Sequence, residues 1–260
     1  MVGGLSRAQR EGELELHYQP IVVLATGVID AVEGLMRWNH PTRGFLTPAA
    51  FIPIAEETGA IVDMGRWALQ DASRQCAGWE RAGLPLGVSV NISAEHFAAG
   101  TLVDDVLGAV EGAGIAARHL VLELTETAIA RNFADAIAQL TELRTAGVRI
   151  AIDDFGSGYS SLGRLASFPV DFLKFDASLI RESGDSRETA VLRGIVSAVV
   201  AIAEAIGVST LAEGIETENQ RLAAMELGCT RGQGYLLARP QPAAGIAELV
   251  RASREVPGPA

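Results

Sequence analysis

Two adjacent carboxylates, Asp153 and Asp154, stand where an apolar run meets a segment rich in glycine and serine. The run at residues 148–153 alternates β-branched residues with others, which predicts a buried strand. Residues 156–161 predict a loop that exposes backbone N–H groups. Adjacent carboxylates repel each other and resist removal from water. Their position indicates either a bound cation or a solvated acidic turn, and the pair alone fits both.

Polar residues also end the other apolar runs that the sequence predicts as strands. Each directly follows such a run: Glu33, Asn91, Glu123, Lys174 and Glu213. If parallel strands close into a barrel, their carboxyl ends meet at one mouth. A single acidic strand end is usually a helix cap or a solvated residue, whereas six polar ends on one rim indicate a site.

The residue types at this mouth favour metal chemistry. An unpaired carboxylate in a buried pocket costs roughly several kcal/mol, and one lysine does not offset the five acids. We therefore expect two divalent cations bridged by Asp153, and oxygen ligands favour Mg²⁺ or Mn²⁺ over zinc. Two such ions beside a lysine suit in-line attack of an activated water on phosphorus.

Other catalytic arrangements find no support in the sequence. The four histidines, His17, His40, His96 and His119, share no motif and are interpreted as structural. No Ser-His-Asp or Cys-His set is evident, and there is no phosphate-binding loop or dinucleotide fingerprint.

The order of the predicted elements positions these residues. A short polar helix at 7–15 precedes two strand-like runs, 16–24 and 28–38, that predict a hairpin. A loop then leads to a helix with Thr47 as N-cap and Pro48 in its first turn. A helix at 61–82 follows, after which strands (86–91, 119–123, 148–153, 170–174, 208–213, 230–236) alternate with helices (101–112, 133–146, a short one after the 156–161 loop, 188–206, 218–227, 243–252). We expect an α/β fold, a (β/α)8 barrel with an antiparallel start, in one domain of residues 1–260 with its core at about 14–250.

Bulk composition limits the partners. The net charge of −11 argues against a nucleic-acid polymer or an anionic membrane, although a phosphorylated small molecule remains compatible with local cations. Cys76 and Cys229 are expected to be reduced, buried thiols of a cytoplasmic domain. No signal peptide is visible in the sequence, and its longest apolar run, at 194–208, is interrupted by Glu204, so this domain is expected to have no membrane contact. Because the chain begins almost at its first strand, we expect a domain cut from a longer multidomain protein, which itself could be membrane-anchored elsewhere.

A set of motifs along the chain resembles the EAL domains, phosphodiesterases that hydrolyse cyclic di-GMP. Glu33-Gly34-Leu35 with Arg37-Trp38 resembles the family signature. The remaining motifs follow in the family's order over about residues 14–250: Tyr18-Gln19-Pro20-Ile21, Asn91-Ile92-Ser93, Glu123-Leu124-Thr125-Glu126, Asp153-Asp154-Phe155-Gly156, Lys174-Phe175-Asp176, Ala212-Glu213-Gly214-Ile215-Glu216 and Gln233-Gly234-Tyr235. The resemblance implies a modified barrel of the triosephosphate isomerase (TIM) type with one antiparallel strand.

The resemblance also implies roles for the residues. Glu33, Asn91, Glu123 and Asp153 would hold the first metal, and Asp153 and Asp154 would engage the second. Lys174 would position the attacking water, Glu213 would be a general base or a further ligand, and Arg37 would pair with a phosphate. Gln19, Asp176, Glu216 and Gln233 would lie around the guanine ends, and ordinary loop polarity is the alternative for each. Glu126 would anchor the loop after Asp154, and because the ordering of this loop is tied to dimerisation in the family, we expect a homodimer. The resemblance also leads us to expect an upstream sensory or GGDEF domain.

Two residues depart from the family's usual pattern. Gly34 replaces the family's usual alanine and Ser157 stands where threonine is common, but no catalytic residue is missing. The favoured function is metal-dependent hydrolysis of cyclic di-GMP to linear pGpG. The alternatives are a catalytically inactive cyclic di-GMP receptor that uses the same barrel, and an enolase-like metal barrel, whose motif order is absent.

Overall fold

Nine strands form the centre of the computed structural model, which describes residues 2–130, 133–155, 168–176 and 187–255. They are β1 (Leu14–Val23), β2 (Ile29–His40), β3 (Gly44–Leu46), β4 (Gly87–Asn91), β5 (Leu120–Thr125), β6 (Arg149–Asp153), β7 (Phe172–Asp176), β8 (Ser209–Glu213) and β9 (Arg231–Gly232). Their order is β1-β9-β8-β7-β6-β5-β4-β2-β3, and an additional pairing of β1 with β2 closes the barrel. This confirms the predicted α/β barrel.

One strand of the barrel runs against the others. β1 is antiparallel to both of its neighbours, β2 and β9, whereas every other barrel pair is parallel. The predicted antiparallel start is therefore confirmed. β3 pairs with the far end of β2, outside the barrel.

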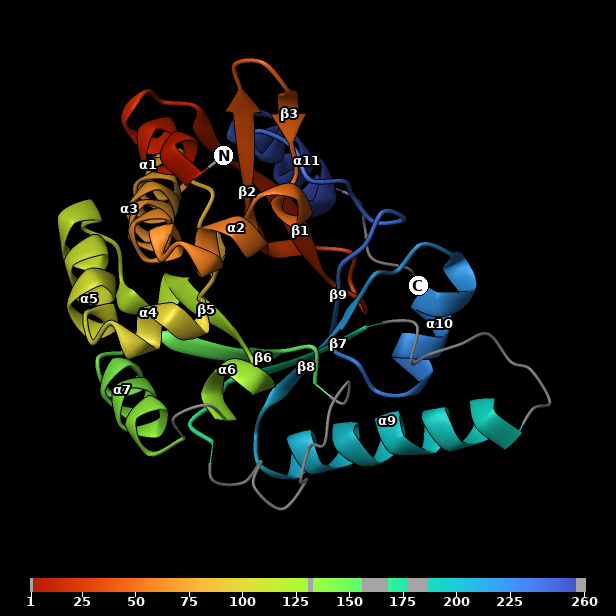
Figure 1. The fold of residues 1–260 in the computed structure, drawn as a ribbon. Coiled ribbons are helices and arrows are strands. Elements are labelled where there is room, and N and C mark those ends of the chain that lie inside the picture. Colours follow the sequence, from red (N-terminus) through yellow and green to blue (C-terminus); the bar gives the residue numbers. More distant parts are fainter. Residues whose placement is uncertain (1, 131–132, 156–167, 177–186, 256–260) are drawn as a thin grey trace.

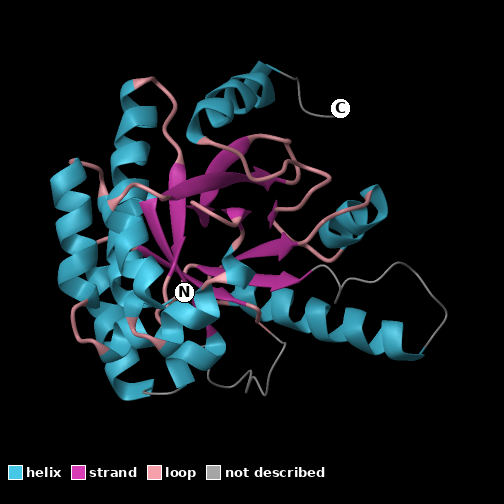
Figure 2. Cartoon of the chain, turned by 45° about the horizontal axis from the view of Figure 1, so that its top comes forward, coloured by secondary structure: helices cyan, strands magenta, loops and turns pink. Residues whose placement is uncertain are grey.

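Helices cover the outside of the barrel (Figure 1). They are α1 (Val2–Arg10), α2 (Ile52–Glu57), α3 (Ala60–Arg81), α4 (Ala94–Ala98), α5 (Leu102–Ala113), α6 (Glu126–Ala130), α7 (Phe133–Thr145), α9 (Arg187–Ala205), α10 (Glu218–Glu226) and α11 (Ala243–Glu255), with single 3-10 turns at Pro48–Ala50 and Ala117–His119. Figure 2 shows the strands enclosed by these helices. Among the described residues, no helix is both long and apolar enough to cross a membrane.

Several local predictions need correction. The first helix begins at Val2 and ends at Arg10, where the sequence predicted residues 7–15. Thr47 makes no capping hydrogen bond, and Pro48 starts a 3-10 turn ahead of α2. β3 and the short helices α4 and α6 were not predicted. The loop at 156–161 and its short helix lie outside the described residues.

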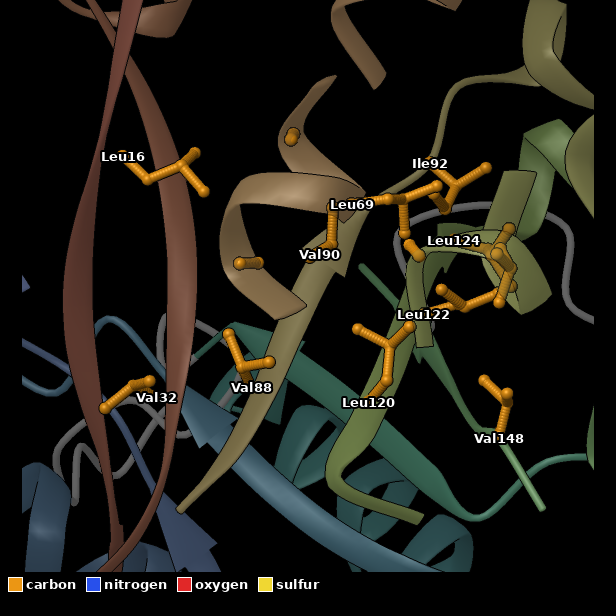
Figure 3. Packing of buried hydrophobic residues seen from close by; sticks show 14 of the residues in the cluster. Leu16, Val32, Leu69, Val88, Val90, Ile92, Leu120, Leu122, Leu124 and Val148 are labelled. Carbon is orange, nitrogen blue, oxygen red and sulfur yellow. The ribbon is translucent and has the colours of Figure 1, made fainter. Parts of the chain in front are cut away.

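The main hydrophobic core lies between the barrel and helices α3, α5 and α7. Along β5, Leu120, Leu122 and Leu124 are buried in this core together with Leu69 of α3 (Figure 3). Because strand side chains alternate, Glu123 on the same strand points to the opposite side, into the barrel. The apolar positions of each strand thus fix which polar residue faces the interior.

Candidate active site

Lys174 lies at the centre of the barrel mouth, and its side chain is 1% exposed. Its Nζ atom lies 2.5 Å from Oε2 of Glu123 and 2.6 Å from Oε1 of Glu213. Oε2 of Glu33 lies 3.6 Å away and Oδ1 of Asp153 lies 3.8 Å away. Four carboxylates from four different strands therefore surround one ammonium group. Asp153 and Glu213 end their strands as the sequence predicted, whereas Glu33 and Glu123 lie before the ends of β2 and β5.

Amide side chains hold the Glu33 carboxylate. Asn91 Nδ2 donates to Oε1 of Glu33 at 2.7 Å, and Gln233 Nε2 donates to Oε2 at 2.7 Å. Gln233 Nε2 also lies 3.1 Å from Oε1 of Gln19, whose own Nε2 donates to the carbonyl of Ala238 at 3.1 Å. Glu33 lies in the middle of β2 and yet at the barrel mouth. The reason is that β2 pairs with β4 only over residues 31–34, and the rest of the strand continues beyond the barrel. Gln19 and Gln233 are thus neighbours of the metal-binding candidates.

The pKa values in this cluster reflect opposing forces. Burial works to lower the pKa of Lys174, but the surrounding carboxylates, Glu123 first, raise that pKa well above its usual value. Burial works to raise the pKa of Glu33, yet Lys174 and the hydrogen bonds from Asn91 and Gln233 lower it. Burial and the charge of Glu33 raise the pKa of Glu123 to about 8 despite the contact with Lys174. One ammonium group therefore does not neutralise the mouth.

Asp153 and Glu213 also form a group with Asp154, in which one oxygen of each residue lies within 4.8 Å of the others. The backbone N–H of Asp154 donates to Oδ1 of Asp153 at 2.8 Å. Among the described non-glycine residues, Asp154 alone has a positive φ, of 53°. Burial and the charge of Asp153 raise the pKa of Asp154, and burial raises the pKa of Glu213 well above its usual value. Left-handed backbone at an acidic site fits local strain held for function.

The donor set fits a divalent cation. Three carboxylates at this spacing offer hard oxygen ligands, and further carboxylates of Glu33 and Glu123 lie just below them around Lys174. Their excess negative charge is what a bound cation neutralises.

The other predicted residues lie around the mouth. Arg37 is buried and donates from Nη1 to the carbonyl of Met36 at 2.8 Å, and burial lowers its pKa. Asp176 and Glu216 are exposed, at the end of β7 and in the segment after β8. Glu126 begins α6 and is half-buried, but most of the loop that it was predicted to anchor lies outside the described residues.

A cavity of about 330 Å³ opens beside Asn91 and was not predicted as a unit. Its walls include Ile52 and Glu56 of α2, Ser93, and Thr125 at the end of β5. Ser93 and Thr125 belong to motifs already quoted, whereas Ile52 and Glu56 carry no sequence signal. They reach the site because α2 packs against this side of the mouth.

Comparisons with known proteins agree with this geometry. The family model described as "EAL domain" matches residues 3–240. The cyclic di-GMP phosphodiesterase NbdA of Pseudomonas aeruginosa is 43% identical over 251 residues, which are 96% of this chain and 32% of that protein. MucR of the same organism, a bifunctional diguanylate cyclase/cyclic di-GMP phosphodiesterase, is 42% identical over 92% of this chain and 35% of its own length. The chain thus spans about a third of the length of these curated relatives.

Solved structures show the same fold. The MucR phosphodiesterase in complex with c-di-GMP matches with a TM-score of 0.87 and 41% identity, over 94% of this chain and 98% of that one. The EAL enzyme Bd1971, bound to cAMP and cyclic di-GMP, matches with a TM-score of 0.87 and 30% identity, over 96% of this chain and 68% of that one.

Proposed function

Because the chain belongs to the EAL domain family, we propose that it hydrolyses cyclic di-GMP to linear pGpG at the barrel mouth. The observation that carries the proposal is the convergence of Glu33, Glu123, Asp153 and Glu213 on Lys174. The names of NbdA and MucR support the substrate, and the MucR complex supports binding of that nucleotide by the same fold.

Glu33, Asn91, Glu123, Asp153 and Asp154 are the proposed holders of Mg²⁺ or Mn²⁺, two ions to a site. Bound there, such ions lower the pKa of water and neutralise phosphate charge. The oxygen-rich donor set favours these hard cations over zinc.

The chain's own residues orient the reaction. The oxygen of a water molecule adds to phosphorus, and the bond from phosphorus to the sugar oxygen breaks. Lys174 donates hydrogen bonds that hold this water and offset the phosphate charge. Glu213, which contacts Lys174, accepts a proton from the water, and burial, which raises its pKa, strengthens it as a base. The departing sugar oxygen takes up a proton from solvent and leaves as a hydroxyl, and Glu213 then releases the proton of the attacking water to solvent.

The remaining residues would fix the nucleotide. The cavity beside Asn91 is large enough to take one end of it, while Gln19 and Gln233 hold Glu33 in place. Arg37, Asp176 and Glu216 are the proposed contacts to phosphate and guanine from the rim. A homodimer, and further sensory or GGDEF domains beside this one, belong to the same proposal. The name of MucR, a bifunctional diguanylate cyclase/cyclic di-GMP phosphodiesterase, supports a second catalytic domain only.

The test is to incubate the purified chain with cyclic di-GMP and Mg²⁺ or Mn²⁺ and to separate pGpG by chromatography. Glu213→Gln should lower kcat by about 100-fold or more, as loss of a general base does. Glu111→Gln, the same change on the exposed face of α5, is the matched control and should leave turnover intact. Binding without turnover in the unaltered chain would instead support a receptor.

A second measurement separates the two roles of Glu213. Calorimetry with Mg²⁺ should give similar affinities for the unaltered chain and Glu213→Gln if Glu213 acts as the base. A large loss of affinity in that variant would make Glu213 a metal ligand instead.

A further inference from the structure

The opposite end of the barrel contains a second cavity, of about 200 Å³. It is bordered by the first residues of the parallel strands, among them Arg149 of β6, Phe172 of β7 and Arg231 of β9. Barrels of this type are usually filled by bulky branched side chains. Here Ala31, Gly87, Ser89 and Ala151 line the hollow instead, and their small size leaves the space open.

The charges around this floor cavity are mostly positive. Arg118 and Arg149 line it and are exposed, and neither guanidinium group forms an ion pair or hydrogen bond with the residues that the structure describes. His119 lies beside them, and its Nδ1 atom is buried without a hydrogen-bond partner in the described part of the chain.

The two acids that face the cavity are already engaged. Asp30 accepts from Nη2 of Arg231 at 2.7 Å, and that guanidinium also lies 5.5 Å from the ring centroid of Phe172. Glu123 contacts Lys174 at the top of the cavity. Two arginines therefore remain unneutralised over a hollow in a protein whose net charge is −11.

We infer that the barrel floor binds a small oxyanion between Arg118 and Arg149. Guanidinium groups form paired hydrogen bonds with the oxygens of phosphates and of carboxylates, so a ligand of either class fits this pair of arginines. The hollow is large enough for a phosphoryl group or a short dicarboxylate, and His119 lies in its lining. This site is separate from the proposed catalytic mouth, although Glu123 and Lys174 border both.

The test measures the thermal unfolding midpoint of the metal-free chain against inorganic phosphate, with NaCl keeping the ionic strength constant. Without metal the mouth carries five carboxylates around one lysine and repels anions, so the result does not depend on the proposed catalytic activity. We expect a rise that saturates with phosphate. Parallel titrations with pyrophosphate and malonate distinguish a phosphoryl from a carboxylate ligand by which one saturates at the lower concentration.

Variants decide whether the rise comes from this cavity. In Arg118→Gln/Arg149→Gln the half-saturating concentration should increase at least about tenfold. The control Arg74→Gln/Arg81→Gln removes the same charge from α3, and its half-saturating phosphate concentration should equal that of the unaltered chain. Gly87→Val keeps both arginines but narrows the hollow, and its Cβ meets no heavy atom closer than 3.5 Å. An unsaturable rise in the unaltered chain, or a rise that either cavity variant retains in full, would overturn the inference.

Discussion

Gly34 stands next to Glu33 on β2, where alanine is usual in the family that the chain resembles. A Cβ at this position would lie 3.3 Å from the carbonyl oxygen of Ser89 and 3.6 Å from Cδ1 of Leu16. The carbonyl belongs to the neighbouring strand β4, so it yields less easily than a side chain. The site therefore accepts a methyl group only tightly.

Gly34→Ala should change the free energy of unfolding by less than about 1 kcal/mol, because two effects oppose each other. Alanine restricts the unfolded chain, which stabilises the fold, while the close contact with Ser89 costs part of that gain. Urea denaturation measures the difference, and turnover should stay within about twofold. A loss above about 2 kcal/mol would mean that the β2–β4 spacing requires glycine at this position.

At the level of residues, the sequence located the charged centre well but not the contacts that organise it. The acids and Lys174 were predictable because each directly follows an apolar strand segment. The hydrogen bonds from Gln233 to Glu33 and Gln19 were not, because they join residues 200 and 214 positions apart. Which amide meets which carboxylate depends on barrel closure, and no local pattern records it.

At the level of elements, Asp105 joins three helical segments. It accepts from Arg66 Nε of α3 at 2.7 Å and from Thr101 Oγ1 at 2.8 Å, and its Oδ2 atom lies 2.9 Å from His96 Nε2 of α4. Burial opposes ionisation of Asp105, but the hydrogen bonds from Arg66, His96 and Thr101 outweigh it and lower the pKa from 3.8 to about 2.

Asp105→Asn should therefore lower the free energy of unfolding near neutral pH by about 2 kcal/mol. Because the pKa of Asp105 is lower in the folded state than in the unfolded state, its ionisation stabilises the fold fully at pH values above the unfolded-state pKa. This stabilisation is lost as the pH falls through the folded-state pKa. The difference between the unaltered chain and the variant should thus fall by about half at about pH 3. Asp63→Asn is the control: Asp63 contacts the same guanidinium at 2.8 Å, but its side chain is 71% exposed, so its loss should cost below about 0.5 kcal/mol. A pH-independent difference would contradict the argument.

The segment around β9 depends on two glycines that flank Gln233. Gly234 has a φ of +157°, and a Cβ there would overlap the backbone of Ile215. A Cβ at Gly232 would lie 2.7 Å from side-chain atoms of both Ile215 and Leu24. This close approach is what brings Gln233 within hydrogen-bonding distance of Glu33.

Gly234→Ala should lower the free energy of unfolding by more than about 2 kcal/mol, because the segment has to move away from Ile215. Chemical denaturation measures this, and the displaced Gln233 should lower turnover as well. Gly108→Ala, on an open face of α5, should have the opposite sign and stabilise by up to about 1 kcal/mol. Equal effects of the two substitutions would mean that the approach to Ile215 is not required.

Elements that alternate in a regular pattern were predictable, and short or tertiary ones were not. The helices on the barrel have boundaries close to those expected, because their apolar spacing marks them and, after α3, so does the terminal Gly83. β3 has only three residues and exists because β2 continues beyond the barrel to meet it. The Thr47 cap failed because Pro48 begins a 3-10 turn, so the threonine side chain finds no helical N–H group.

At the scale of the whole molecule, charge is distributed unevenly along the barrel axis. The mouth gathers five carboxylates around Lys174, while Arg118 and Arg149, whose guanidinium groups have no partner in the described part of the chain, lie at the floor. The antiparallel strand β1 closes this barrel through β2 and β9, and so links the two ends of the described chain. Repulsion at the mouth therefore acts on closure of the whole barrel.

A divalent cation that binds only the folded mouth should stabilise the entire domain. Binding at about 100 times the dissociation constant contributes about 2.7 kcal/mol, which for a chain of this size corresponds to a rise of roughly 5–10 °C in the unfolding midpoint. Calorimetric scans with Mg²⁺ and with NaCl at equal ionic strength separate specific binding from screening. Asp153→Asn/Asp154→Asn should abolish the Mg²⁺-dependent rise, whereas Asp63→Asn/Asp71→Asn, which removes two acids from α3, should retain it. An equal rise in NaCl, or a full response in the Asp153/Asp154 variant, would mean that the mouth does not hold the cation.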